Sequence, residues 1–527
     1  MISAVPAADS THVGLDAEIV IEFSEAVIPR SCEEALFITP FAGENVKYKW
    51  RRDKTLTIIF GEPLLKDRTY IVTIGAGTKD RRNNMMQQSF TLAFSTGDVL
   101  DKGGIRGAVY GDKVEGVQIW AYDLNELVTP NPTEDFPLYI TQAGKDGKWA
   151  LTNMALSRYR LFAIMDRDVN NKYNVEYDLL GVATRDILLD SLKSNINPMN
   201  FRIALEDTTQ PMLAQASAPD ERHIDLRFTE ALLPDSLTSI SNYTISSETD
   251  TLPISDAGID FYNAAVIHMT TEKQDSSKEY TARVNFARDL NYLPILADSS
   301  MATFKGSGIP DTTRPDYLTM QPKDSSNFIA LDASLEFIFS KAMAPEKIQK
   351  NLVVADTLGD TIPGGVKWHS LSRFIFTPSK NYIKERFYYA TLPVDSILDL
   401  SGNAISDTLF QRQFVTVNPD TFSAISGNIK DADSSEAGPF YLKANYIEKK
   451  NPRFYELWVN GEGRFEFKDM MPGRYSIQVF RDQNSDGRFS PGTAFPFQPA
   501  DRFYVFPDTI EIRSRWPDEG ENILLPE

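Results

Sequence analysis

Two acidic loops are the segments of this 527-residue chain whose residue types and spacing could hold a cation. The clearer loop reads DQNSDGRF and places the oxygen-bearing side chains of Asp482, Asn484 and Asp486 at alternate positions. Gly487 can supply the positive φ of a tight turn, and Arg488 could add its backbone carbonyl. This is the pattern of the first half of an EF-hand calcium loop. We therefore expect structural Ca²⁺ as the only cofactor of the chain.

A similar loop lies earlier in the chain. Its expected ligands are the side chains of Asp166, Asp168 and Asn170 and the backbone carbonyl of Lys172, with Glu176 or Asp178 as the closing carboxylate. Neither loop ends in the bidentate Glu of an EF-hand, because Tyr177 and Thr493 stand at that position. The alternative is a hairpin turn whose Asp and Asn side chains accept hydrogen bonds from their own backbone.

Residues that could act as catalysts are sparse. No two histidines have the spacing of metal ligands, and the sequence lacks H-E-x-x-H, G-x-S-x-G, G-x-x-x-x-G-K-S/T and C-x-x-C. The single cysteine, Cys32, excludes an intrachain disulfide, and the carboxylates that follow it would raise the pKa of its thiol. We therefore predict that the chain is not an enzyme. The histidines are His12, His223, His268 and His369.

The charge balance narrows the classes of partner. The chain has 54 Lys and Arg against 73 Asp and Glu, which gives a net charge of −19, and no basic cluster interrupts it. Such a surface repels phosphate backbones, so we predict no nucleic-acid partner. No apolar run is long enough to span a bilayer, which predicts no transmembrane segment.

The elements that must position the acidic loops are short strands. Apolar residues alternate with polar ones in Glu18–Glu25, Thr55–Phe60, Ser334–Phe339 and Arg474–Phe480, and Pro, Gly, Asn and Asp bound these runs. This pattern predicts an all-β protein built from sandwiches. Short helical turns are expected only after Pro29, Pro234 and Pro345.

One pattern occurs three times. The tetrapeptide Phe-Ser/Thr-x-Ala begins at Phe23, Phe228 and Phe339, and the later two copies follow DTTQP at Asp207 and DTTRP at Asp311. Three copies indicate three domains of one kind. The variable position of the tetrapeptide is Glu25, Glu230 and Lys341, which argues against a carboxylate site common to all three.

A second pattern occurs twice and contains the acidic loops. IRGAVY at Ile105 resembles ISGNIK at Ile425, and RYRLFAIMDRDVNNKY at Arg158 resembles RYSIQVFRDQNSDGRF at Arg474. A nearly constant offset relates residues 1–205 to residues 317–525 as two copies of one two-domain unit. The linkers between domains are short, which predicts an articulated, elongated rod.

The aromatic stretch Phe495–Phe506 allows two interpretations. Its rings could form an exposed platform for a ligand such as a sugar or peptide. Because aromatic residues occur on both parities of the strand pattern, we favour burial in a core or between domains.

The first pattern resembles the bacterial Ig-like domain of S-layer proteins, the SbsA or Big_5 type. The resemblance rests on FSEAV at Phe23, FITP at Phe37, the strands from Trp50 to Ile74, FSTG at Phe94 and DLSGN at Asp399. At the last motif the other copies read KDRRNN and RDLNYLP. The second pattern is similar to transthyretin-like or CnaB-like sandwiches through I-x-G-x-V/I, G-x-W/F-x-F/L and the acidic loop.

Together these resemblances imply five tandem sandwiches. Ig-like domains are expected at 1–97, 206–309 and 310–418, and transthyretin/CnaB-like domains at 98–205 and 419–527. The arrangement resembles exported Ig-like lipoproteins of Bacteroidota-type bacteria. It implies export to the periplasm or outer-membrane surface, a leader trimmed from the sequence and a lipid anchor on a cysteine upstream of Met1.

These expectations converge on a non-catalytic structural, scaffold or adhesion-type protein of the cell envelope, stiffened by calcium, whose partners are other envelope proteins. Two alternatives stay open. The chain could be an accessory lipoprotein subunit of an outer-membrane machine for export, uptake or protein insertion, or it could be an array of carbohydrate-binding modules.

Overall fold

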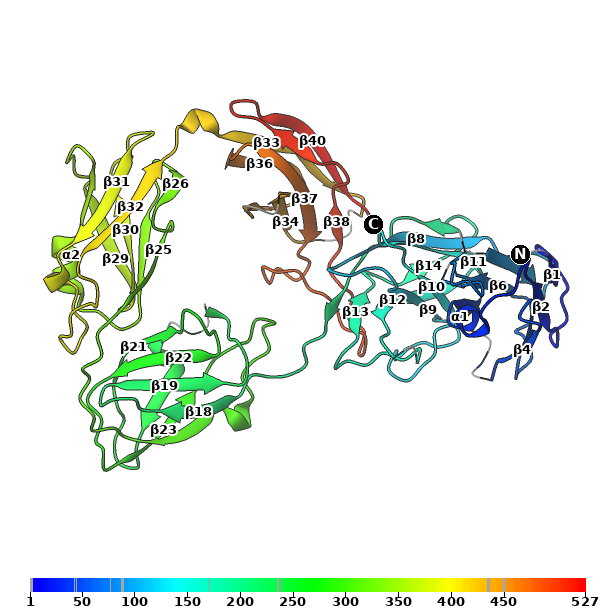
Figure 1. Cartoon of the computed structure of the whole chain (residues 1–527), viewed down its shortest axis with the longest axis horizontal. Coiled ribbons are helices and arrows are strands. Elements are labelled where there is room, and N and C mark those ends of the chain that lie inside the picture. The colour runs from blue at the N-terminus through cyan, green and yellow to red at the C-terminus, as the bar shows by residue number, and fades with distance from the viewer. Residues whose placement is uncertain are drawn as a thin grey trace. The chain divides into compact units, whose positions relative to one another are not determined.

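The computed structural model is all-β and describes residues 3–41, 43, 45–75, 77–86, 90–168, 170–234, 237, 239–433, 437–448 and 452–527 (Figure 1). Its strands form five pairs of sheets, within residues 3–95, 103–205, 213–305, 317–416 and 423–525. No described strand crosses a predicted domain boundary. We number these domains one to five along the chain.

The first, third and fourth domains repeat one topology. One sheet has antiparallel neighbours in the order β1-β2-β5-β4, β18-β19-β22-β21 and β25-β27-β30-β29, respectively. The opposite sheets are β3-β6-β7, β20-β23-β24 and β26-β32-β31-β28. The bounds in the first domain are β1 Ser3–Val5, β2 Ile19–Glu22, β3 Leu36–Thr39, β4 Lys47–Arg51, β5 Thr55–Ile59, β6 Thr69–Ile74 and β7 Phe90–Ser95. Those in the third are β18 Leu213–Ser217, β19 His223–Phe228, β20 Tyr243–Ser246, β21 Ile254–Ile259, β22 Val266–Thr271, β23 Glu279–Val284 and β24 Met301–Lys305. Those in the fourth are β25 Tyr317–Gln321, β26 Ser326–Ile329, β27 Leu335–Phe339, β28 Val353–Asp356, β29 Gly364–Ser370, β30 Arg373–Pro378, β31 Phe387–Leu392 and β32 Phe410–Thr416.

The second and fifth domains share a different topology, in which the first strand pairs in parallel with the end of the domain. Strand β8 pairs with β15 and β16, and β33 pairs with β40. The bounds in the second domain are β8 Gly103–Tyr110, β9 Gln118–Asp123, β10 Tyr139–Gln142, β11 Lys148–Met154, β12 Arg158–Met165, β13 Leu179–Val182, β14 Ile187–Leu188, β15 Asn195–Ile196, β16 Phe201–Arg202 and β17 Ala204–Leu205. Those in the fifth are β33 Ser423–Asp431, β34 Phe440–Tyr446, β35 Phe454–Val459, β36 Gly463–Met470, β37 Gly473–Arg481, β38 Phe503–Val505, β39 Ile510–Ile512 and β40 Asp518–Leu525.

The predicted alternation is confirmed by the burial of the strands. In β27, Leu335, Phe337 and Phe339 are buried and the residues between them are not. Side chains of a strand alternate between the two faces of its sheet, so each strand gives one face to its own core. The helices α1 (Pro29–Glu33) and α2 (Pro345–Asn351) begin at the predicted prolines. Residues 235, 236 and 238, which follow Pro234, lie outside the described residues.

The contacts divide the chain into two compact units. One unit contains residues 1–206, 424–512 and 516–527, and the other contains residues 207–423 and 513–515. The first unit therefore joins the first and second domains to the fifth.

Candidate functional site: acidic loops and an aromatic groove in the first unit

The second acidic loop leaves β37 as a network of side-chain hydrogen bonds. The Asp482 carboxylate is buried, and it accepts hydrogen bonds from the backbone N–H groups of Asp486 (3.1 Å) and Gly487 (2.8 Å). Gly487 adopts φ +80°, the positive value that the sequence predicts for it. Arg488 donates from Nε to the carboxylate of Asp486 at 2.9 Å. The loop is therefore closed by its own carboxylates.

The first loop repeats the backbone hydrogen bonds of this network. Asp166 accepts hydrogen bonds from the N–H groups of Asn170 (3.3 Å) and Asn171 (2.8 Å). Asn171 adopts φ +56° in the place of the glycine. Asp168 accepts a hydrogen bond from the Tyr177 hydroxyl at 2.9 Å. The sequence match between the two loops is thus a match in geometry.

A second carboxylate closes each loop from outside the alternating motif. Asp178 is fully buried and accepts from the N–H groups of Arg167 (3.1 Å) and Asn174 (2.8 Å). In the fifth domain, Asp501 accepts from the corresponding N–H groups, those of Gln483 and Ser490. Asp178 is one of the two closing carboxylates that the sequence suggests.

Sequence reasoning missed Asp501. Asp178 comes four positions after Asn174, whereas Asp501 comes eleven positions after Ser490. An inserted segment of the fifth domain therefore moved the carboxylate away from its expected position. Burial, followed by the charges of Asp482 and Asp486, raises the pKa of Asp501 to about 6. Asp501 is therefore close enough to Asp482 and Asp486 for their charges to act on it.

Both loops still use their carboxylates as hydrogen-bond acceptors. Within the part of the chain that the structure describes, neither loop brings three His, Cys, Asp or Glu ligand atoms within 4.8 Å of one another. A cation would therefore have to draw the oxygens closer together. Calcium ligands, including Asn and backbone carbonyls, lie 2.3–2.6 Å from the ion.

The insertion in the fifth domain, which lies between Ser490 and Asp501, packs against the second domain. Phe497 lies edge-on to Phe162, with ring centroids 6.2 Å apart, and the Arg160 guanidinium lies 3.8 Å from the Phe497 ring centroid. Ala494 and Ala500 join a buried cluster that includes Trp120 and Phe162. Interdomain packing, which we predicted for this stretch, is confirmed for Phe497.

The neighbouring aromatic residues are divided between core and solvent. Phe503 is buried and lies edge-on to Tyr110 of the second domain, with ring centroids 5.4 Å apart. Phe495 is 57% exposed, and no ring contact to it is found among the described residues. The stretch is therefore an interface segment, with Phe495 left exposed at its start.

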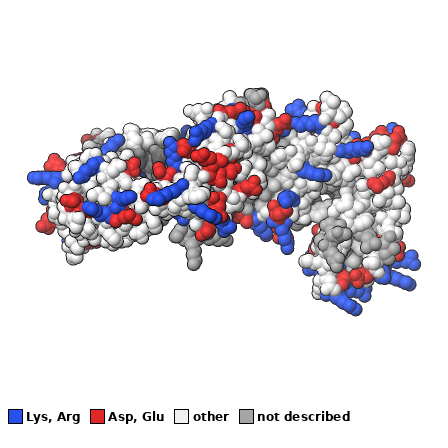
Figure 2. All heavy atoms as spheres, turned by 90° about the horizontal axis from the view of Figure 1, so that it is seen from above, with Lys and Arg blue, Asp and Glu red and all other residues white. Residues whose placement is uncertain are grey.

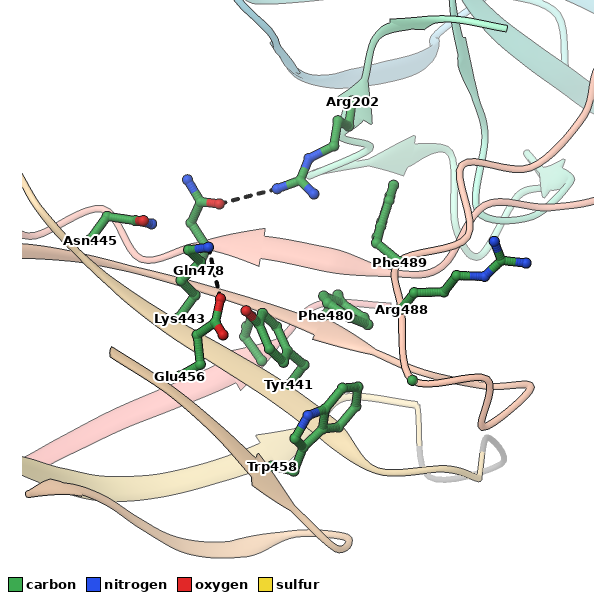
Figure 3. A pocket seen from close by; sticks show the side chains of 12 residues that line it. Arg202, Tyr441, Lys443, Asn445, Glu456, Trp458, Gln478, Phe480, Arg488 and Phe489 are labelled. Carbon is green, nitrogen blue, oxygen red and sulfur yellow. Dashed lines mark hydrogen bonds and ion pairs between the residues drawn. The ribbon is translucent and has the colours of Figure 1, made fainter. Parts of the chain in front are cut away.

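A groove of about 680 Å³ lies instead on the outer face of β34, β35 and β37, beside β16 (Figure 3). Trp458, Tyr441 and Phe480 are cross-strand neighbours, and their rings form one row. Tyr441 lies 5.0 Å from Trp458 and 4.9 Å from Phe480 between ring centroids. The next row along these strands is Glu456, Lys443 and Gln478, in which Lys443 and Glu456 form an ion pair of 2.8 Å.

Arg202 of the second domain faces these rows. It donates from Nη2 to the side-chain oxygen of Gln478 at 3.1 Å, and its guanidinium lies 4.7 Å from the Phe489 ring centroid. Burial lowers the pKa of Arg202. The ionisable side chain that acts on Arg202 is Tyr441, and among the described residues no carboxylate forms an ion pair with this partly buried cation.

The remaining candidate side chains have structural surroundings. Cys32 is buried, and this burial raises the pKa of its thiol to about 11, more than the neighbouring Glu33 does. His268 lies between the carboxylates of Asp225 (2.7 Å) and Asp260 (2.9 Å). His223 pairs with Asp220 at 2.8 Å.

On the face drawn in Figure 2, basic side chains lie among acidic ones and form no separate patch. Among the described residues, no helix has the length and apolar character needed to cross a membrane.

The family comparison agrees with the shared topology of the first and fourth domains. Residues 1–96 and 311–416 match the model of Big_5, a bacterial Ig-like domain. These two segments are similar to that family. No curated protein matches the chain.

Solved structures resemble the chain at low identity. The N-terminal part of the bacterial S-layer protein SbsC is 15% identical over 39% of this chain and 44% of its own, with a TM-score of 0.18. The LD transpeptidase LdtMt1 in complex with imipenem is 8% identical over 28% of this chain and 74% of its own, with a TM-score of 0.16. The I-band fragment I67–I69 from titin is 8% identical over 61% of this chain and 100% of its own, with a TM-score of 0.14. This chain spans less than half of the S-layer fragment.

Proposed function

We propose that the chain is a non-catalytic structural or adhesion-type protein of the cell envelope, exported to the periplasm or the outer-membrane surface. The observation that carries the proposal is the docked insertion around Phe497, which joins the second and fifth domains into one unit. A contact of this kind stiffens an assembly of β-sandwich domains. The match to a bacterial Ig-like domain supports the envelope location.

Cell fractionation with chemical crosslinking tests this role. The protein should appear in the envelope fraction and crosslink there to other envelope proteins. Recovery in the cytoplasmic fraction would contradict the location. Turnover of a substrate at a site that one substitution abolishes would contradict the non-catalytic role.

Calcium binding by the acidic loops is part of this proposal. Ca²⁺ would replace the N–H groups that now satisfy the Asp166 and Asp482 carboxylates, and it would bring Asp178 and Asp501 into coordination. Titration calorimetry should show heat of Ca²⁺ binding that Asp482→Ala and Asp166→Ala each reduce. Unchanged binding in both variants would refute the loop sites.

A second candidate function rests on the aromatic groove. Trp458, which is 42% exposed, and the half-buried Tyr441 beside it offer stacking area, and Arg202 offers a cation that forms no ion pair with a carboxylate among the described residues. A saccharide that carries carboxylates would use both. Trigalacturonate should bind the full chain, and Trp458→Ala and Arg202→Gln should each weaken that binding. Equal binding of a neutral trisaccharide would rule out the role of Arg202.

A further inference from the structure

An aspartate turn recurs in all three Ig-like domains, although the sequence motif DLSGN is visible only in the fourth. Asp80, Asp289 and Asp399 each accept hydrogen bonds with Oδ1 from the N–H groups two and four residues later, at 2.7–3.0 Å. Each also forms a β-bridge to the residue two positions after the variable position of the tetrapeptide, namely Val27, Leu232 and Met343. The variable position therefore lies beside this aspartate in every copy.

In the fourth domain, the aspartate of the turn pairs with a side chain of the same domain, the ammonium of Lys341. The Lys341 ammonium donates to both carboxylate oxygens of Asp311 at 2.7 Å and to Asp399 Oδ2 at 2.6 Å. It also donates to the carbonyl oxygen of Thr313 at 2.8 Å. The side chains of both aspartates are 1% exposed, and that of Lys341 is 10% exposed. Two carboxylates and a carbonyl thus surround one positive charge away from water.

The third domain has the same carboxylates without the lysine. Asp207 and Asp289 are the counterparts of Asp311 and Asp399, and Glu230 takes the position of Lys341. Carboxylate oxygens of these three residues lie within 4.8 Å of one another. The side chain of Asp289 is buried, and those of Asp207 and Glu230 are partly buried.

The two domains therefore differ by two units of charge at one place. The fourth domain combines two carboxylates with an ammonium, whereas the third combines three carboxylates. Like charges this close, with one of them out of water, oppose ionisation. Burial raises the pKa of Glu230, and the charges of Asp207 and Asp289 raise it further.

We propose that Asp207, Glu230 and Asp289 bind a divalent cation of the calcium class at the place where the Lys341 ammonium lies in the fourth domain. Oxygen-only ligands, mostly carboxylates, are those that Ca²⁺ prefers. The carbonyl of Thr209 is the counterpart of the fourth ligand, the carbonyl of Thr313. The proposal does not depend on the acidic loops of the second and fifth domains, which are separate sites.

Hydrogen exchange of the full chain, with and without Ca²⁺, locates the binding. The amides of Asn291 and Leu293 bond to Asp289, so their exchange should slow roughly tenfold when free Ca²⁺ is ten times its Kd. Glu230→Lys should abolish this response, because the new ammonium takes the place of the metal ion. Native mass spectrometry should then find one Ca²⁺ fewer per chain.

Glu25→Lys is the matched control, because Glu25 has the same position in the first domain and is exposed. It should leave the response of Asn291 and Leu293 unchanged. Glu230→Gln, which keeps the shape and removes one charge, should weaken Ca²⁺ binding and guards against misfolding of the lysine variant. The proposal is overturned if wild-type Asn291 and Leu293 do not respond to Ca²⁺, or if Glu230→Lys responds as the wild type does.

Discussion

At the scale of single residues, the surroundings of Cys32 determine its reactivity. Burial raises the pKa of the thiol to about 11, so at pH 8 only about a thousandth of it is thiolate, against roughly a quarter for a free cysteine. We expect the native chain to react with a maleimide or a disulfide reagent at least about a hundredfold more slowly than the unfolded chain. Absorbance of a released thiol probe measures both rates.

A neighbouring carboxylate provides the control for this prediction. Glu34→Gln removes a charge that the sequence led us to connect with the raised pKa, but the largest cause in the structure is burial. The variant should therefore react as slowly as the wild type. A variant that reacts as fast as unfolded protein would show that the carboxylate controls the thiol.

His268 makes the stability of the third domain depend on pH. Its hydrogen bond to Asp225, followed by that to Asp260, raises its pKa above the ordinary 6.5, although burial opposes this. The charged imidazole is favoured in the folded state. The stabilisation is therefore complete below pH 6.5 and is lost as the pH rises through the higher folded value.

Melting temperatures between pH 6 and 9 measure this loss. The wild type should become less stable as the pH rises, and His268→Gln should flatten the part of the curve that comes from the third domain. His12→Gln is a suitable control, because the His12 side chain is 71% exposed. Equal pH profiles for wild type and His268→Gln would contradict the assignment.

The sequence predicted some of these residues and concealed others. The alternating acidic motif pointed to the turns that Asp166 and Asp482 close, because local spacing builds them, and the cation sites there stay a prediction. Asp501 could not be identified, because the inserted segment separates it from the motif in sequence. In the folded chain it nevertheless lies beside the loop. Lys341 seemed to argue against a shared site, since its meaning depends on Asp311 and Asp399, which lie far from it in sequence.

At the scale of elements, a glycine in the first strand of the second and fifth domains allows that strand to lie close to the backbone of the neighbouring segment. A Cβ on Gly427 of β33 would lie 1.9 Å from the carbonyl oxygen of Glu521 in β40. The corresponding Cβ on Gly107 of β8 would lie 1.6 Å from the carbonyl oxygen of Met199. This explains physically why both copies carry the I-x-G-x-V/I pattern.

Gly427→Ala should force β40 away from β33. We expect it to lower the free energy of unfolding of the fifth domain by about 1–3 kcal/mol, as overpacked sites do. Gly365→Ala is the control, because a Cβ there has no atom within 4 Å. Scanning calorimetry of the two variants measures the difference, and equal transitions would show that β40 moves without cost.

Strand periodicity predicted the sheets well, because each strand covers one core with alternate residues. The aspartate turns were harder to see. The turn needs Asp at its first position and a positive φ at its fourth, where Asn83, Tyr292 and Gly402 adopt φ values of 65°, 68° and 87°. Three different residues meet that need, so no common motif appears in the sequence.

At the scale of the whole molecule, the insertion of the fifth domain packs against the second domain and so joins the two within the first unit. Phe497→Ala should weaken the contact between the second and fifth domains by on the order of 2 kcal/mol, because the ring packs on Phe162 and Arg160. Faster hydrogen exchange in β12 and β13 would report the loosened contact. Phe495→Ala, in the same insertion but 57% exposed, should leave exchange unchanged. Identical exchange in the two variants would contradict a role for the Phe497 ring.

The sequence predicted the duplication of the two-domain unit, but it did not predict the contact between the two copies. The offset between the copies identifies related domains, but a surface contact depends on complementary shape. The only local signal was the aromatic content of the insertion.

The contact around Phe497 also sets the path of mechanical load. Residues 207–423 leave the first unit after residue 206 and return to it at residue 424. A pull between the two chain ends would therefore pass through the contact between the second and fifth domains, and the intervening domains would bear no tension. Rupture of that contact would release their whole length at once. The contact would act as a sacrificial bond wherever it ruptures at a lower force than the sandwiches unfold.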